Sequence, residues 1–98
     1  MRRAAKRDAN EGEIITALRE AGVRVFQVSD GGFPDLACLW RGVWHLLEVK
    51  GRSGSLTPAQ KAMVADVEAG GGKVHVVRTP AEALAVFAEA NQKPLEAR

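Results

Sequence analysis

Two acids and a lysine, Asp35, Glu48 and Lys50, are the residues of this chain whose types and spacing best suit chemistry. Carboxylate oxygens are ligands that Mg²⁺ and Mn²⁺ prefer, and both ions keep several waters when bound. A cation held in this way polarises a phosphate, lowers the pKa of a bound water and stabilises a leaving oxygen. The three residues therefore point to metal-assisted phosphodiester hydrolysis. Taken alone, a lysine near two acids describes a surface ion pair equally well.

A β-hairpin would bring the two acids together. If its turn is centred on Arg41-Gly42, counting outward along the strands places Asp35 directly opposite Glu48. Opposed carboxylates repel one another, and a divalent cation removes that penalty. Lys50 is two residues beyond Glu48, so it lies on the same side of the strand. The acids favour its charged form, so we expect it to hold the water or stabilise the phosphorus rather than act as a base.

The remaining elements follow from glycines, caps and apolar runs. In chain order we expect a helix at about 8–21, strands at 23–28, 35–40 and 43–50, a helix opened by the capping box Thr57 to Gln60, a strand at 73–78, and a helix from Thr79 to about Ala90. The order αβββαβα predicts an α/β fold with a mixed four-stranded sheet flanked by helices. The 98 residues form one domain, 1–98, with a basic arm at 1–7 and a frayed tail at 91–98.

Three short segments make the chain similar to a known superfamily. They are Gly32-Phe33-Pro34-Asp35-Leu36, Leu47-Glu48-Val49-Lys50-Gly51 and Leu56-Thr57-Pro58-Ala59-Gln60. Together with the element order, they resemble the PD-(D/E)xK nucleases and their restriction-endonuclease-like core. Within that superfamily the chain looks most like the small stand-alone VRR-NUC domains of phages and bacteria. The resemblance extends from about Asp8 to Phe87.

The resemblance implies roles for the residues that carry it. Asp35, Glu48 and the backbone carbonyl of Val49 would bind Mg²⁺ or Mn²⁺, and Lys50 would be the catalytic lysine. Gln60 matches a glutamine that the family places on the helix after the lysine strand, where it orients the lysine or the phosphate. As the last member of a capping box, Gln60 has an equally good structural explanation.

The family also takes a metal ligand from its first helix, and Glu11 and Glu13 are both candidates here. Glu11 lies closer to the apolar stripe of Ile14 and Leu18, and hence nearer the sheet, so it is favoured. Both acids are also explained as first-turn residues that the helix dipole stabilises.

Basic and polar residues outside this cluster suit contacts with phosphates. Arg52 and Ser53 lie in the loop after the lysine strand, and Arg2 and Arg3 lie in the basic arm. Solvation of an exposed loop and of a frayed terminus explains the same residues.

The function implied is a Mg²⁺- or Mn²⁺-dependent DNA nuclease that acts on branched DNA such as Holliday junctions, as a homodimer. A single cysteine, Cys38, excludes an internal disulfide. No apolar run approaches the roughly 18 residues of a membrane span, so we expect a cytoplasmic protein. The alternative is a non-catalytic nucleic-acid-binding or interaction module that retains the nuclease fold. The joint presence of Asp35, Glu48 and Lys50 argues against it.

Overall fold

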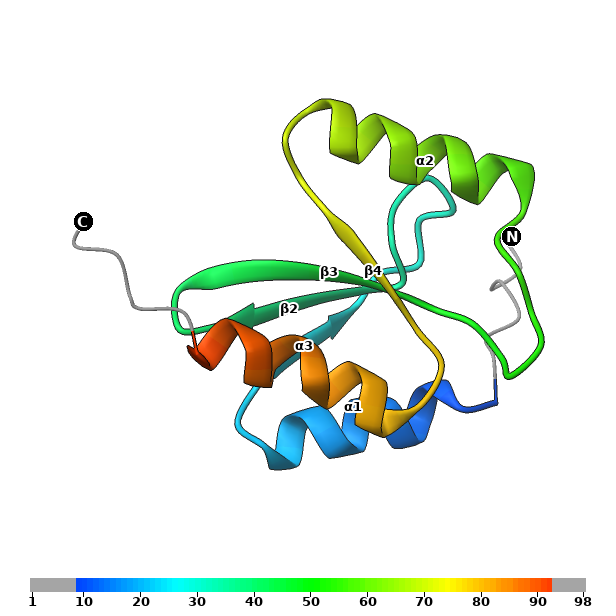
Figure 1. Cartoon of the computed structure of the whole chain (residues 1–98). Coiled ribbons are helices and arrows are strands. Elements are labelled where there is room, and N and C mark those ends of the chain that lie inside the picture. The colour runs from blue at the N-terminus through cyan, green and yellow to red at the C-terminus, as the bar shows by residue number, and fades with distance from the viewer. Residues whose placement is uncertain (1–8, 93–98) are drawn as a thin grey trace.

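The computed structural model describes residues 9–92 and shows a four-stranded mixed sheet with helices on both faces (Figure 1). The elements are α1 (Glu11–Glu20), β1 (Arg24–Gln27), β2 (Leu36–Trp40), β3 (Val43–Val49), α2 (Pro58–Ala69), β4 (Val74–Val77) and α3 (Pro80–Gln92). The strands follow one another in the order β1-β2-β3-β4. The first two pairings are antiparallel, and β3 pairs with β4 in parallel through the crossover helix α2. The expected fold and element order are confirmed.

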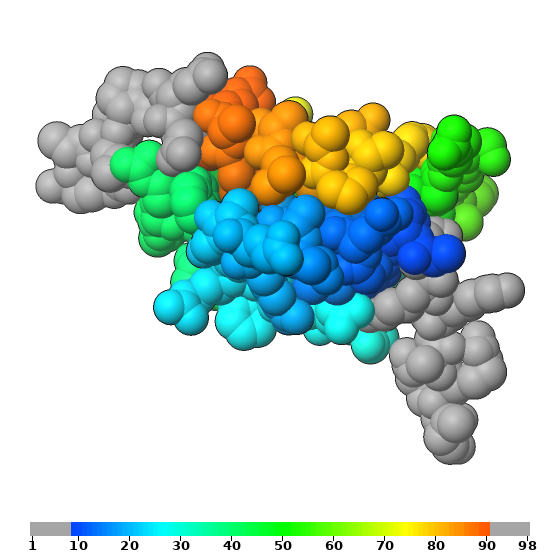
Figure 2. Space-filling model, turned by 90° about the horizontal axis from the view of Figure 1, so that it is seen from below, coloured from blue at the N-terminus to red at the C-terminus, as the bar shows by residue number. Residues whose placement is uncertain are grey.

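The two faces of the sheet are covered unequally. Helices α1 and α3 lie side by side under one face, as the view from below shows (Figure 2), and α2 lies alone over the other (Figure 1). The core lies on the α1/α3 side, where Leu18, Leu36 and Leu47 are fully buried and Phe87 of α3 is nearly so. Helix α2 contributes no fully buried side chain. The sheet face under α2 therefore keeps more contact with solvent.

The turn between β2 and β3 sets the register of the hairpin. Arg41 and Gly42 both have positive φ, 54° and 80°, as a two-residue turn of type I′ requires. Trp40 therefore pairs with Val43, and the pairing continues to Leu36 opposite Leu47, as expected. One further step along both strands brings Asp35 beside Glu48.

Two helix ends differ from the expected positions. Helix α1 begins at Glu11 instead of at about Asp8, because Asn10 is its N-cap residue and supplies the first helical acceptor, a carbonyl that accepts from the amide of Ile14 at 3.2 Å. Helix α3 continues to Gln92, two residues into the expected tail 91–98, because the first helix breaker after Ala90 is Pro94. No helix within residues 9–92 is both long enough and apolar enough to cross a membrane.

Candidate active site

Asp35 and Glu48 lie side by side at the open end of the hairpin, and each carboxylate accepts a hydrogen bond from a main-chain amide of the opposite segment. The amide of Asp35 donates to Oε1 of Glu48 at 3.3 Å, and the amide of Val49 donates to Oδ2 of Asp35 at 2.9 Å. Each carboxylate is thus fixed by the backbone of the neighbouring segment. The register predicted from the turn does bring the two acids together.

The environment of Glu48 disfavours the charged form of its carboxyl group beside the carboxylate of Asp35. Its side chain is only 2% exposed. Burial in the first place, and the charge of Asp35 in the second, raise the pKa of Glu48 to about 7, although the Asp35 amide and the Lys50 charge act in the opposite direction. Two hard-oxygen carboxylates that resist joint ionisation suit a divalent cation, which would stabilise both in the charged form. In the part of the chain that the structure describes, no three His, Cys, Asp or Glu side chains gather as a metal-binding group, so this site rests on a pair.

Gln60 connects the lysine, the acid and the start of α2. Its Oε1 accepts from Nζ of Lys50 at 3.1 Å, and its Nε2 donates to Oε2 of Glu48 at 2.9 Å. The same Oε1 accepts from the amide of Thr57 at 2.9 Å, and the Thr57 hydroxyl accepts from the Gln60 amide, which completes the capping box. The capping role and the contacts with the candidate catalytic residues, which the sequence left as alternatives, are therefore combined in one side chain.

The structure separates the two acids of the first helix. Glu11 is 3% exposed and accepts from Nε2 of Gln27 at 3.2 Å, whereas Glu13 is exposed. Burial of an acid beside the sheet agrees with the preference for Glu11 over Glu13. A role for Glu11 as a metal ligand stays a prediction.

The candidate phosphate-binding residues are only partly placed. Arg52 and Ser53 are exposed in the loop that follows Lys50. Arg2 and Arg3 lie outside the described residues, as does the rest of the basic arm 1–7. Nothing in the structure tests their contact with DNA.

Sequence reasoning did not find Asn10 or Arg78, which both contact the main chain at the end of the lysine strand. Asn10 occupies the N-cap position of α1, where an asparagine side chain usually binds a main-chain amide of its own helix, but it makes no such bond here. Arg78 follows β4 and has the sequence context of an ordinary exposed strand end. Their hydrogen bonds to residues distant in the sequence are what distinguish Asn10 and Arg78 from an ordinary helix cap and an ordinary strand end.

An αβββαβα core with paired acids and a lysine where β2 begins and β3 ends defines the PD-(D/E)xK nuclease class. The family model described as "VRR-NUC domain" matches residues 4–81. The chain therefore belongs to the VRR-NUC family, and membership of this family implies nuclease activity.

Comparison with other proteins agrees with this assignment. A solved structure titled "VRR_NUC domain" is 24% identical, with a TM-score of 0.68 over 83% of this chain and 97% of that one. At this identity the match shows a shared fold. A search of curated proteins found no match.

Proposed function

We propose that the chain is a Mg²⁺- or Mn²⁺-dependent DNA nuclease that hydrolyses phosphodiester bonds, with a preference for branched DNA such as Holliday junctions. One observation carries the proposal. Asp35 and Glu48 adjoin one another, and Gln60 bonds at once to Glu48 and to Nζ of Lys50. A cation ligand pair and a positive charge are thus held together in one network.

The cation would be held by Asp35, Glu48 and the backbone carbonyl of Val49. Glu11 of α1, which does not gather with the two acids in this structure, would be a further ligand. The raised pKa of Glu48 supports this assignment, because it arises from a buried acid that lies beside a second carboxylate, and the nearby Lys50 charge does not offset both effects. When bound, the cation supplies polarisation of a phosphate oxygen and acidification of a water.

The chain's own groups bind and orient the substrate. Lys50 presents an ammonium group whose Nζ is fixed by Gln60, and it stabilises negative charge on the phosphate during hydrolysis. Arg52 and Ser53, exposed in the following loop, contact the adjoining backbone phosphates. The arm residues Arg2 and Arg3 add sequence-independent affinity. Such contacts recognise backbone and shape, which fits selection of a DNA structure over a base sequence.

A cleavage assay with matched lysine variants tests the activity. Labelled DNA is incubated with Mn²⁺ and with a chelator, using the wild type, Asp35→Ala, Lys50→Ala and the exposed control Lys61→Ala. We expect cleavage only with Mn²⁺, a loss of about 100-fold or more for Asp35→Ala and Lys50→Ala, and wild-type rates for Lys61→Ala. Cleavage that persists in chelator or survives both site variants would contradict the proposal. Metal-dependent binding without cleavage would favour the alternative of a non-catalytic module.

The preference for branched DNA and the dimer are parts of the same proposal. A chain with one acid pair makes one cut, so symmetrical cleavage of a junction needs a second copy. Phe26 and Trp44 supply a surface for it, because they are 52% and 56% exposed and their rings contact one another at 5.8 Å between centroids. Comparing cleavage of a four-way junction, a flap and the matching duplex tests the preference, and equal rates on all three would contradict it.

A further inference from the structure

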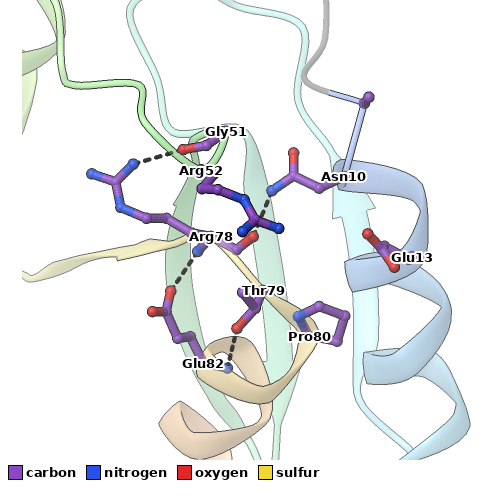
Figure 3. Close-up of a pocket in the computed structure, with 9 residues that line it drawn as sticks. Asn10, Glu13, Gly51, Arg52, Arg78, Thr79, Pro80 and Glu82 are labelled. Carbon is purple, nitrogen blue, oxygen red and sulfur yellow. Dashed lines mark hydrogen bonds between the residues drawn. The ribbon is translucent and has the colours of Figure 1, made fainter.

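Side chains from two distant parts of the chain bind the main chain directly after β3. Nδ2 of Asn10 donates to the carbonyl of Lys50 at 3.0 Å and to that of Arg78 at 2.6 Å. Nη1 of Arg78 in turn donates to the carbonyls of Gly51 and Gly54, at 2.7 Å and 2.5 Å. Figure 3 shows Asn10 reaching from the start of α1 and Arg78 reaching toward Gly51 from the end of β4.

These contacts begin directly after the end of the strand pairing between β3 and β4. Val49 and Val77 are the last paired residues of β3 and β4, and the amide of Lys50, one residue further on, donates to the carbonyl of Val77 at 3.1 Å. The carbonyls of Lys50, Gly51 and Gly54 instead accept from the side chains of Asn10 and Arg78. A cavity of about 490 Å³ lies beside them, lined by both residues and by Arg52. Open space here means that side-chain bonds, rather than close packing, fix the path of the loop.

The contacts also bind the two ends of Lys50 from different elements. Gln60 of α2 fixes the ammonium group, and Asn10 fixes the carbonyl of the same residue. Asn10 directly precedes Glu11, so one amide also ties the start of α1 to the end of the lysine strand. This amide does not cap α1, which is the usual role of asparagine at that position.

We propose that Asn10 and Arg78 are positioning residues, which hold the backbone of Lys50 and of the loop 51–54 so that the lysine and Glu11 keep a fixed spacing. In this proposal they act through the backbone of Lys50 and of the loop, not by direct contact with DNA or metal. The inference rests on the proposed nuclease function. It predicts that their loss lowers the rate of the chemical step and leaves binding largely intact.

The variants remove the donor of Asn10 and alter the donor geometry of Arg78, while preserving size or charge. Asn10→Asp keeps the shape but sets a carboxylate against two carbonyl oxygens, and Arg78→Lys keeps the charge but loses the planar donor group. Arg19→Lys is the matched control, because Nη2 of Arg19 donates to the carbonyl of Val25 at 2.8 Å, an equivalent side-chain bond to the main chain of β1 instead of the lysine strand. Arg52→Ala gives the contrasting pattern for a residue that contacts phosphate.

Kinetics are measured below the melting temperature of every variant, with folding confirmed by circular dichroism. We expect kcat to fall about tenfold or more in Asn10→Asp and Arg78→Lys, with KM within about twofold of the wild type. Arg19→Lys should retain wild-type kcat, and Arg52→Ala should chiefly raise KM. An unchanged kcat in both positioning variants, or an equal loss in Arg19→Lys, would overturn the proposal. If one variant fails to fold, the other carries the same comparison.

Amide hydrogen exchange supplies a readout that does not depend on activity. The amide of Gly54 donates to the carbonyl of Gly51 at 3.2 Å, so its exchange reports the order of the loop. Faster exchange over 50–54 in Arg78→Lys but not in Arg19→Lys supports the positioning role, even if the wild type cleaves no DNA and the proposed function fails. Unchanged exchange overturns it.

Discussion

Glu48 shows how burial and a neighbouring acid together shift the pKa of one carboxyl group. Its carboxylate is 2% exposed, lies beside Asp35, and has a pKa raised to about 7 by burial and by that neighbour. The native state therefore holds the Glu48 proton more tightly than the unfolded chain does. The resulting stability is complete below the unfolded pKa and is lost as the pH rises through about 7.

This linkage predicts the pH dependence of stability in the metal-free protein. Relative to Glu48→Gln, which stays neutral, the wild type should lose unfolding free energy on the order of 1–3 kcal/mol between about pH 5 and pH 8. Urea unfolding at several pH values in chelator measures this difference. Mn²⁺ should restore the lost unfolding free energy of the wild type at pH 8 and should change that of Glu48→Gln little.

Glu68→Gln, at an exposed position on α2, is the control and should show no such trend. A difference between the wild type and Glu48→Gln that does not change with pH would contradict the prediction.

Helix α2 shows how hydrogen bonds at its first turn can fix the position of a helix that packs little against the core. It contributes no fully buried side chain, so its position depends heavily on its first turn. There the capping box of Thr57 and Gln60 satisfies the free amides, and Gln60 also bonds to Lys50 and Glu48. The cap thus aligns the helix with the site.

Removing the cap should therefore lower kcat more than another substitution on α2 that costs the same unfolding free energy. Thr57→Ala should cost about 1 kcal/mol of unfolding free energy. It should also lower kcat, because Gln60 loses the bond that fixes its backbone. Ala62→Gly is a matched control, since glycine inside the exposed face of α2 costs about 1 kcal/mol without touching the cap. Urea unfolding and cleavage rates are measured for both. An equal loss of kcat in the two variants would show that the cap has no special role.

At the scale of the whole molecule, the layers determine which surface is left for a partner. Helices α1 and α3 cover one face of the sheet, and α2 covers the other incompletely (Figure 1). Phe26 and Trp44 stay exposed on neighbouring parts of the sheet, and their rings contact one another. Apolar side chains gathered in this way are typical of an interaction surface.

The proposed homodimer leads to a prediction for this surface. Trp44→Glu should shift the sedimentation of the protein from dimer to monomer and lower junction cleavage more than cleavage of a linear duplex. Val43→Glu is the control, since Val43 is also exposed, at 44%, but its side chain points to the opposite side of the strand. A wild type that sediments as a monomer at high concentration would contradict the dimer.

The parts of the site that depend on short spacings could be predicted from the sequence. A two-residue turn at Arg41-Gly42 fixes the register, and the two-residue period of a strand then aligns Asp35 with Glu48. The capping box of α2 is equally local, because three positions separate Thr57 from Gln60. Helical periodicity also favoured the buried Glu11 over the exposed Glu13.

The contacts between the hairpin, the capped helix α2 and the start of α1 depend on the tertiary structure and could not be predicted from short spacings. Gln60 reaches Lys50 and Glu48 across the gap between α2 and the sheet, and Asn10 reaches carbonyls 40 and 68 residues away. The amide of Asn10 gains these two carbonyl partners only because the start of α1 lies against the ends of β3 and β4. Turns and caps are encoded within a few residues because their bonds close there. Contacts between elements depend on packing, which brings distant donors and acceptors together.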